Sequence, residues 1–403
     1  MSLIVQKFGG TSVANTERLK NVADIVTKTA QAGNQVVVVV SAQGDTTDDL
    51  IVKAAELNDR PSKREMDVLL NTGEMISMSL LAMAIQKLGF PVVSLTGWQI
   101  GLETNSNYSD ARIKRIAGER LKAELDNGRI VIVAGFQGIN QMGDVTTLGR
   151  GGSDTTAVAI AATLGADLCQ IYTDVDGVYT ADPRKVPTAR KLKEITYDEM
   201  LDLATLGAGV LHNRSVEMAK KYGVPLVVRS SLNTSEGTVV KEEVTVERML
   251  ISGVALDTDA VRIAVIGLKD TPGVAFRLFD VLAKKNINVD VILQSIGRAG
   301  TKDISFTVDD KDLDDAMAVL DENKARLGYQ ELHSERNIAK LSIVGAGMMS
   351  NPGVAAKMFE SLYNEGVNIN MISTSEIRVT VLINEKDGVR AMNAVHDAFN
   401  LAD

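Results

Sequence analysis

Cysteine, histidine and tryptophan are scarce in this sequence. Its 403 residues include one cysteine (Cys169), one tryptophan and three widely spaced histidines (His212, His333 and His396). A single cysteine excludes an internal disulfide, and so few thiols and imidazoles disfavour a thiolate or multi-histidine metal site. Chemistry must therefore depend on lysine, arginine, carboxylates, hydroxyls and backbone amides.

Long apolar runs and an excess of positive charge are also missing. No run approaches the roughly 18 apolar residues that a membrane helix needs. Lys and Arg total 43 against 52 for Asp and Glu, and the formal net charge of -9 disfavours nucleic acid or an anionic bilayer as the main partner. The start MSLIVQKF lacks the charged-then-apolar pattern of a signal segment. We therefore expect a cytoplasmic protein that binds neither nucleic acid nor membrane.

The length fits two or three domains, and the first 232 residues alternate short apolar runs with amphipathic stretches. The predicted strands are 3–8, 36–42, 91–97, 129–136, 168–174 and 224–230, and the predicted helices are 14–32, 63–88, 109–127, 153–165 and 209–222. Continuously apolar strands are typical of a mainly parallel sheet with helices on both faces. The first domain is therefore predicted to be α/β, with its site at the carboxyl ends of the strands.

The second half of the chain contains an internal repeat. Residues 263–295 align without a gap on 343–375, with identical residues at positions that include both Pro-Gly turns. Each copy reads strand, turn, helix, strand, strand, helix, and the first adds a last strand at 328–333 to complete βαββαβ. The second copy lacks this strand, and we predict that the apolar stretch 249–256 pairs with it.

A lysine and two glycines follow the first predicted strand, in the order Lys7, Phe8, Gly9, Gly10. At such a turn, backbone amides and an ammonium group can approach phosphate oxygens together. A plain tight turn with a surface lysine fits the local pattern equally well. The sequence contains no GxxxxGK[ST] Walker loop, and no GxGxxG fingerprint opens the domain.

Two further clusters are candidate binding sites. The run Gly149 to Asp154 (GRGGSD) precedes an alanine-rich helix, where an arginine fork and a helix N-terminus suit a carboxylate. The alternative is that Ser153 or Asp154 is simply the N-cap of this helix, and for Asp154 alone the local pattern favours capping, whereas it does not account for Arg150 between glycines. The segment 173–184 (TDVDGVYTADPR) follows a strand and carries acids, a tyrosine and an arginine that suit a nucleotide, although a simple turn cluster is the alternative. Its DVDG lacks the other ligands of a calcium loop.

Three motifs together resemble one family. KFGGTSV (7–13), TTLGRGGSDTTA (146–157) and TDVDGVYTADPR (173–184), in this order before paired Pro-Gly modules, are similar to the aspartate kinases over the whole chain. The resemblance implies an α/β amino-acid-kinase domain at 1–245 with a mainly parallel central sheet. It also implies two α+β, ferredoxin-like ACT regulatory domains at 263–335 and at 249–257 plus 338–403.

The resemblance further implies a reaction and its regulation. The γ-phosphoryl group of ATP, with Mg²⁺, would pass to the β-carboxylate of L-aspartate to give 4-phospho-L-aspartate, the first step towards lysine, threonine and methionine. Lysine, threonine or both would act as feedback effectors, and the chain would form a homo-oligomer through its ACT domains.

The resemblance also assigns residues. Lys7 and Asp154 would be catalytic. The aspartate side would comprise Ser41, Thr47, Glu74, Arg150, Gly151, Gly152 and Ser153. The nucleotide would be bound by Lys7, Phe8, Gly9, Gly10, Thr173, Asp174, Tyr179, Thr180, Ala181, Asp182, Pro183 and Arg184. Effectors would lie between Asp270, Gly273, Ala275 and Gln294 of one module and Asn368 and Ile369 of the other. The family often has a lysine where this chain has Gly209.

A carboxylate acceptor explains why histidine is dispensable. With a reference pKa of about 3.9 it is already ionised, so the enzyme must supply cations and orientation rather than a general base. Arg150 would hold the α-carboxylate and Glu74 the α-ammonium, while Lys7 offsets the charge of the phosphates. Two alternatives are a kinase for another amino acid such as glutamate and a catalytically silent amino-acid sensor. The joint presence of Lys7, Arg150 and Asp154 argues against the sensor.

Overall fold

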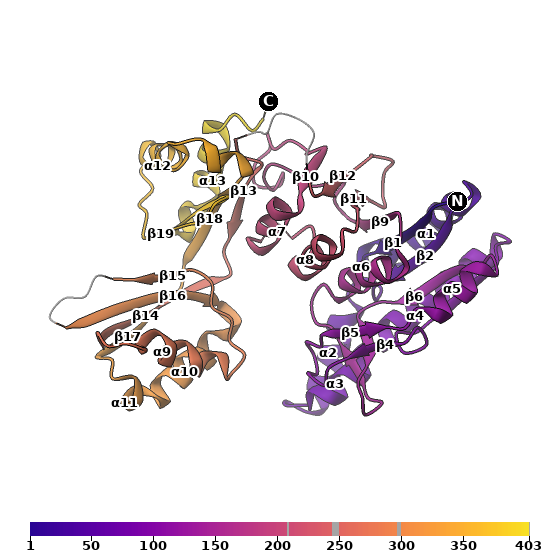
Figure 1. Cartoon of the computed structure of the whole chain (residues 1–403), viewed down its shortest axis with the longest axis horizontal. Helices are drawn as coiled ribbons and strands as arrows, with labels where there is room; N and C mark the ends of the chain where they lie inside the picture. Colours follow the sequence, from indigo (N-terminus) through magenta and orange to yellow (C-terminus); the bar gives the residue numbers. More distant parts are fainter. Residues whose placement is uncertain (208, 244–249, 296–299, 403) are drawn as a thin grey trace. The chain divides into compact units, whose positions relative to one another are not determined.

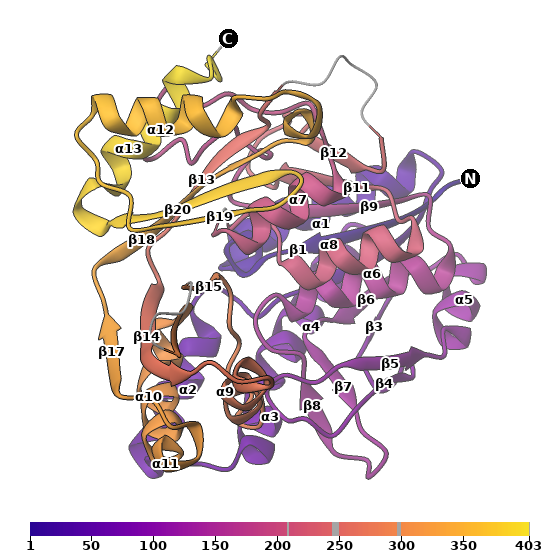
Figure 2. The same cartoon turned by 60° about the vertical axis from the view of Figure 1, so that its left-hand side comes forward.

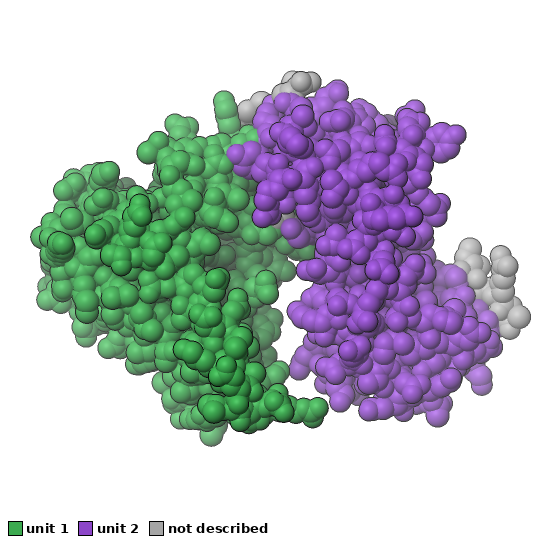
Figure 3. Space-filling model, turned by 180° about the vertical axis from the view of Figure 1, so that it is seen from behind, with its two compact units in different colours: residues 1–178, 191–205, 209–246 green, residues 179–190, 206–208, 247–403 purple. Residues whose placement is uncertain are grey.

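The computed structural model describes residues 1–207, 209–243, 250–295 and 300–402. These residues form two compact units, coloured separately in Figure 3. The first unit comprises Met1–Val178, Lys191–Thr205 and Gly209–Val246, and the second comprises Tyr179–Arg190, Leu206–Ala208 and Glu247–Asp403.

The first unit is built on an eight-stranded sheet with the order β10-β12-β11-β9-β1-β2-β6-β3 (Figures 1 and 2). Its strands are β1 Leu3–Phe8, β2 Gln35–Val40, β3 Val92–Leu95, β6 Ile130–Ala134, β9 Leu168–Thr173, β10 Glu194–Thr196, β11 Leu226–Ser230 and β12 Thr238–Lys241. All neighbours pair in parallel except β11 and β12. The mainly parallel sheet predicted from the apolar runs is confirmed.

Helices cover both faces of this sheet. Val36, Val38 and Val40 of β2 belong to a core cluster with residues of α1 (Thr16–Gln31) and α4 (Thr72–Lys87). The intervening Val37 and Val39 point to the opposite face and are also fully buried. There α6 (Gly152–Leu164) packs on β1, β2 and β9, and α8 (Asn213–Tyr222) packs on α6. Burial on both faces explains why these strands read as continuous apolar runs.

The prediction of one helix over 109–127 was wrong. The segment contains β5 (Ile113–Ile116), which pairs with β4 in a small sheet, and then α5 (Glu119–Asp126). Gly118 separates the two with a φ of +80°, a conformation that favours glycine. The small sheet has the order β5-β4-β7-β8, and its other strands are β4 Leu102–Thr104, β7 Gln137–Ile139 and β8 Val145–Thr147. The first unit also contains α2 Thr46–Leu57, α3 Lys63–Leu70, α7 Tyr197–Thr205 and the 3-10 helix η1 Gly10–Val13.

Residues Lys63–Lys87 are the one stretch in the described part of the chain that is long and apolar enough to cross a membrane. Half of its most apolar window is buried inside the protein, and α4 packs on β3, β6 and α1. The apolar residues of this stretch therefore contribute to the core of the first unit.

The second unit contains two modules of the same design. Their sheets have the orders β15-β16-β14-β17 and β19-β20-β18-β13, and every pair of neighbours is antiparallel. The first module has β14 Ala260–Lys269, α9 Val274–Ala283, β15 Ile292–Gln294, β16 Thr301–Asp309, η2 Asp310–Asp312, α10 Leu313–Glu322, α11 Lys324–Leu327 and β17 Glu331–Glu335. The second has β13 Gly253–Asp257, β18 Ile338–Val344, η3 Ala346–Ser350, α12 Val354–Asn364, β19 Met371–Thr374, β20 Arg378–Asn384, η4 Glu385–Asp387 and α13 Gly388–Ala398.

The missing strand of the second module comes from upstream of the first. β13 pairs antiparallel with β18, so it occupies the position that β17 holds in the first module. The core of the second module also receives Ala181 and Val186, which lie some 70 residues upstream of β13 in the sequence. Met249, at the start of the stretch predicted to pair here, lies outside the described residues.

Candidate active site

The carboxyl ends of β1 and β2 and the start of α6 surround a cavity of about 260 Å³ in the first unit. All seven residues assigned to the aspartate side line it, together with Lys7 and Asp154. The lining is Lys7, Gly10, Ser41, Ala42, Gly44, Thr47, Glu74, Phe136, Gly149, Arg150, Gly151, Gly152, Ser153 and Asp154. Segments more than 100 residues apart thus meet at the sheet edge where the sequence placed the site.

Lys7 and Asp154 form an ion pair within this cavity. Lys7 Nζ lies 2.6 Å from Asp154 Oδ1, and each side chain is only 11% exposed. Asp154 lies in the first turn of α6, but the N-cap position belongs to Gly151. The capping role considered for Ser153 and Asp154 is therefore excluded, and Asp154 holds the lysine instead.

Glu74 offers the cavity a carboxylate oxygen without a partner. It lies in the first turn of α4 and is 4% exposed. Its Oε1 accepts a hydrogen bond from the Ala42 amide at 3.0 Å, whereas Oε2 has no hydrogen-bond partner among the described residues. Burial raises the pKa of Glu74 to about 7, and the Ala42 amide and the Lys7 charge oppose this rise. A ligand cation reaching Oε2 would favour the ionised form.

The loop before α6 is shaped by glycines and presents Arg150 to the cavity. Gly149 and Gly151 have φ values of +75° and +68°. A Cβ on Gly151 would lie 2.2 Å from Cγ of His212, so only glycine fits. Arg150 is exposed and has no hydrogen-bond or ion-pair partner in the described part of the chain, which leaves its guanidinium available to an anion.

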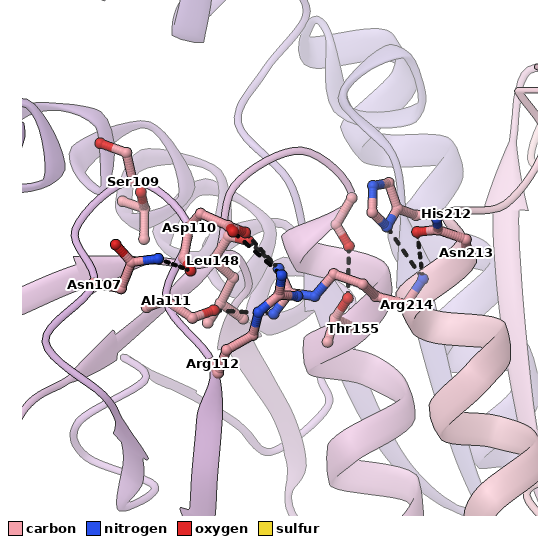
Figure 4. A network of polar contacts seen from close by, with 12 residues as sticks. Asn107, Ser109, Asp110, Ala111, Arg112, Leu148, Thr155, His212, Asn213 and Arg214 are labelled. Carbon is pink, nitrogen blue, oxygen red and sulfur yellow. Dashed lines mark hydrogen bonds and ion pairs between the residues drawn. The ribbon is translucent and has the colours of Figure 1, made fainter. Parts of the chain in front are cut away.

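Arg214 supports this loop and was missed from the sequence. Figure 4 shows its guanidinium reaching from the start of α8 to the loop: Nη1 donates to the Leu148 carbonyl at 2.5 Å and Nη2 to the Ala111 carbonyl at 2.9 Å. Nη1 also lies 3.2 Å from Asp110 Oδ1. Leu148 immediately precedes Gly149, so Arg214 fixes the backbone at the start of the loop that contains Arg150. Because the contacts that hold this loop are to backbone carbonyls, no residue spacing reveals this role.

The glycine turn after β1 lies beside Thr173 and Asp174. β1 pairs with β9, and the Gly9 amide donates to the Tyr172 carbonyl at 3.2 Å. Thr173 donates to Asp174 Oδ1 at 2.9 Å, and the Asp174 side chain is exposed. Phe8, by contrast, is fully buried and stacks on Tyr172, with 4.5 Å between ring centroids. Only the backbone of Phe8 is left for a nucleotide.

The remaining predicted nucleotide residues, Tyr179 to Arg184, belong to the second unit. Thr180 and Ala181 are buried there, so their side chains are closed to a nucleotide. Asp182 and the exposed Arg184 form a two-point pair, with Nε to Oδ1 at 2.9 Å and Nη2 to Oδ2 at 3.0 Å. Hydrogen bonds from the Arg184 side chain lower the pKa of Asp182. Pro183 is exposed beside them.

The residues predicted for effectors lie at the turns and edge strands of the two modules. Gly273 is the N-cap of α9 with a φ of +85°, and Asp270 pairs with Lys302 at 2.9 Å. Gln294 ends the exposed edge strand β15, which lies close to β19 of the second module. Ala275 and Ile369 each pack against the core of their own module, whereas Asn368 is exposed.

The described residues contain no group of three His, Cys, Asp or Glu side chains that could hold a metal ion. Gly209 has a φ of +65°, a left-handed conformation that suits glycine.

Comparison with known proteins defines first a class. The amino acid kinase family model matches residues 2–230, and the ACT domain model matches 263–323 and 341–399. The parallel sheet, the cavity at its carboxyl edge and the two βαββαβ modules therefore define an amino acid kinase with paired ACT modules.

Individual relatives narrow the class. An aspartokinase of Bacillus sp. (strain MGA3) is 53% identical over 403 residues, covering 100% of this chain and 98% of that protein. The crystal structure of E. coli aspartokinase III with aspartate and ADP has a TM-score of 0.85 at 26% identity, covering 98% of this chain and 99% of that one. The same enzyme with lysine and aspartate has a TM-score of 0.75 at 27% identity, covering 100% of both. The chain belongs to the aspartokinases, the ATP-dependent kinases that act on the carboxyl group of aspartate.

Proposed function

We propose that this chain transfers the γ-phosphoryl group of ATP to the β-carboxylate of L-aspartate, with the cavity between β1, β2 and α6 as the aspartate site. The observation that carries the proposal is the complementary set of open charges in this cavity. Among the described residues, Glu74 Oε2 is buried without a hydrogen-bond partner and Arg150 has no hydrogen-bond or ion-pair partner. Lys7 lines the same cavity and is paired with Asp154. The product, 4-phospho-L-aspartate, would lead towards lysine, threonine and methionine.

Glu74 and Arg150 are the groups that would orient the amino acid. Glu74 Oε2 accepts the α-ammonium group and the Arg150 guanidinium binds the α-carboxylate through two parallel hydrogen bonds. Ser41 and Thr47 line the same cavity and offer hydroxyls. With both α-substituents held, the β-carboxylate is directed towards the phosphate side. Glutamate has one more methylene, so its carboxylate would be displaced from this position.

Lys7 and the neighbouring amides would stabilise the transferring group. The acceptor carboxylate is ionised at neutral pH, so the main barrier is its repulsion by the triphosphate. Lys7 Nζ, fixed by Asp154, supplies a positive charge that needs no reorganisation during the reaction. The first-turn residues of α6, Gly152 and Ser153, line the cavity, where a helix N-terminus favours negative charge.

We further propose that Mg²⁺ accompanies the nucleotide. In kinases Mg²⁺ is bound by one or two carboxylates together with substrate phosphates, where it neutralises phosphate charge. Asp154 and the exposed Asp174 are the carboxylates at this sheet edge that would hold it.

Feedback control through the second unit completes the proposal. We place the catalytic domain at 1–245, the first ACT domain at 263–335, and the second at 249–257 plus 338–403. E. coli aspartokinase III, a structural relative, was crystallised with lysine, which supports lysine as an effector here. Threonine, alone or with lysine, is the second effector that we propose. We also propose a cytoplasmic location and a homo-oligomer associated through the exposed edge strands of the modules.

An acceptor panel tests the proposed reaction. The purified chain is incubated with ATP, Mg²⁺ and L-aspartate, L-glutamate or no acceptor, and ADP and hydroxylamine-trapped acyl phosphate are measured. We expect both products with aspartate and at most background with glutamate. Glutamate-dependent turnover would favour the kinase of another amino acid, and no turnover with either would favour the silent sensor.

A further inference from the structure

Residues 179–190 form a loop that belongs to the second unit, although the chain directly before and after it belongs to the first unit. Its two ends are held together by hydrogen bonds from the Leu192 amide to the Val178 carbonyl and from the Thr180 amide to the Arg190 carbonyl, both at 2.8 Å. It contains the part of the nucleotide motif from Tyr179 to Arg184. What holds its interior therefore bears on nucleotide binding.

The interior of the segment is held by the second ACT module. Thr180 is fully buried, and its Oγ1 lies 2.9 Å from Nε2 of His396 on α13. The Thr180 carbonyl accepts a hydrogen bond from the Val254 amide of β13 at 2.7 Å. Asn393, also on α13, donates from Nδ2 to the Lys185 carbonyl at 3.0 Å. Ala181 and Val186 complete the attachment by entering the core of that module.

The hydrogen-bond network defines the state of His396. The ring is fully buried, and its Nδ1 has no hydrogen-bond partner in the described part of the chain, because Asp397 Oδ1 is 3.8 Å away. Burial lowers the pKa of His396, so the imidazole is neutral. Its hydrogen is then best placed on Nε2, donating to Thr180 Oγ1, which also accepts from the Arg190 amide at 2.9 Å. The Thr180 hydroxyl can donate to the Leu401 carbonyl, 3.4 Å away.

This arrangement separates the motif into inward and outward residues. Thr180 and Ala181 face the module, whereas Asp182 and Arg184 remain on the surface and hold each other. The inward contacts fix the backbone from which the outward side chains project. A change in the module at α13 would therefore be transmitted to those side chains.

We propose that His396 and Asn393 are positioning residues for the nucleotide: they hold segment 179–186 in the conformation that binds ATP. The proposal rests on the nucleotide role that the family resemblance implies for Tyr179 to Arg184, which we adopt here as part of the proposed function. It gives the second ACT module a physical connection to the segment that would bind ATP. Altering this connection should change the KM for ATP and leave the KM for aspartate and kcat nearly unchanged.

Pairs of substitutions test the proposal. Thr180→Val removes the hydroxyl at nearly constant shape and Thr180→Ser retains it, while His396→Leu removes the donor and His396→Gln can replace it. We expect Thr180→Val and His396→Leu to raise the KM for ATP at least about fivefold. Thr180→Val leaves the buried His396 Nε2 without a partner, and His396→Leu removes one of the hydrogen bonds that hold Thr180. Thr180→Ser and His396→Gln should restore most of the affinity. The KM for aspartate and kcat should stay within about twofold in all four.

A matched control separates positioning from simple loss of stability. Thr380 is buried in the same module, and its hydroxyl bonds Ser342 Oγ at 2.7 Å, away from segment 179–190. Thr380→Val should lower the melting temperature about as much as Thr180→Val without changing the KM for ATP. If the Thr180 and His396 variants lose stability but keep the wild-type KM for ATP, the contacts are only structural and the proposal is overturned.

Two further variants keep the test decisive. Asn393 is partly exposed, so Asn393→Ala should fold even where the buried variants do not, and it should raise the KM for ATP by about twofold or more. If the buried variants do not fold, an unchanged KM in Asn393→Ala overturns the proposal. Arg184→Ala tests the underlying nucleotide role separately. If it leaves the KM for ATP unchanged while the Thr180 variants raise it, the assignment of Arg184 fails and the positioning role stands.

Discussion

At the scale of single residues, Lys7 and Glu74 are two ionisable groups of the cavity with different surroundings. Lys7 already has a counterion, Asp154, at 2.6 Å. Glu74 has one oxygen satisfied by a backbone amide and the other unpartnered in the described structure. We therefore expect the positioned Lys7 to stabilise negative charge that develops in the transition state. Glu74 would instead bind a positively charged group of the substrate.

Replacing Lys7 tests the first of these roles. Lys7→Ala should lower kcat by at least about a hundredfold, because a fixed cation acts mainly in the transition state. Lys220→Ala is the control, since Lys220 pairs with Asp198 on the surface of the same unit at 2.6 Å. Steady-state kinetics with saturating substrates measure both. An unchanged kcat in a folded Lys7→Ala protein would remove this lysine from the mechanism.

The raised pKa of Glu74 predicts a pH dependence of aspartate binding. With a pKa of about 7 in the free enzyme, Glu74 is protonated and neutral at lower pH and loses its attraction for an ammonium group. The KM for aspartate should therefore rise as pH falls below 7 and level off above it. Glu74→Gln should have a high KM that no longer varies between pH 6 and 8. A wild-type KM that is flat across pH 7 would contradict the role of Glu74.

The sequence could name most cavity residues but not which atoms face the ligand. Lys7, Glu74 and Arg150 were predicted, because family motifs retain charged groups that contact substrates. Phe8 and Thr180 lie in the same motifs, yet their side chains are buried. A residue can belong to a motif because it packs in the core or because it binds a ligand. The sequence alone does not distinguish these two reasons.

At the scale of elements, the loop from Leu148 to Gly152 depends on its neighbours as much as on its own glycines. Gly151 gives the backbone room against His212, and Arg214 holds the Leu148 and Ala111 carbonyls. Both supporting residues come from the first turn of α8 or the residue before it. These long-range contacts leave no periodic signal in the sequence, so they could not be predicted.

Removing the Arg214 support should weaken aspartate binding. Arg214→Ala leaves two carbonyls without their donor, and the displaced Arg150 loop should raise the KM for aspartate roughly tenfold. Arg112→Ala is the matched control. Arg112 also pairs with Asp110, at 3.2 Å, but its side chain is about half exposed. Kinetics with varied aspartate at fixed ATP distinguish them. Equal effects of the two substitutions would mean that Arg214 acts only through surface charge.

Strands and helices differed in how well they could be predicted. Each of the six long apolar runs is a strand of the large sheet, because burial on both faces leaves a strong pattern. The segment 109–127 was misassigned because β5 has only four residues, two of them exposed and charged. Such a short, half-exposed strand carries too few apolar positions to distinguish it from a helix start.

At the scale of the whole molecule, order along the chain is not order in space. β13 precedes the first module but completes the sheet of the second, and segment 179–190 from the middle of the kinase region enters the second module's core. The repeat revealed an incomplete second module and so indicated where its missing strand belongs. The attachment of segment 179–190 gave no sequence signal, because a buried threonine and alanine are ordinary residues in any turn.

Effector binding is the prediction that belongs to this scale. Lysine, threonine or both should inhibit turnover at millimolar concentration by favouring a less active arrangement of the modules. Gln294→Ala, on the exposed strand β15, should relieve the inhibition with little change in uninhibited kcat. Inhibition curves and calorimetric titrations with each amino acid measure this. If neither amino acid binds or inhibits the wild-type protein, the regulatory proposal fails and the kinase assignment remains.

The central claim is that the cavity between β1, β2 and α6 binds aspartate through Arg150. The most direct measurement is the KM for each substrate in purified Arg150→Ala, compared with wild type. Our account predicts that the KM for aspartate rises at least about tenfold, because a two-point carboxylate contact is lost, while the KM for ATP stays within about twofold. A variant in which only the KM for ATP rises would contradict it.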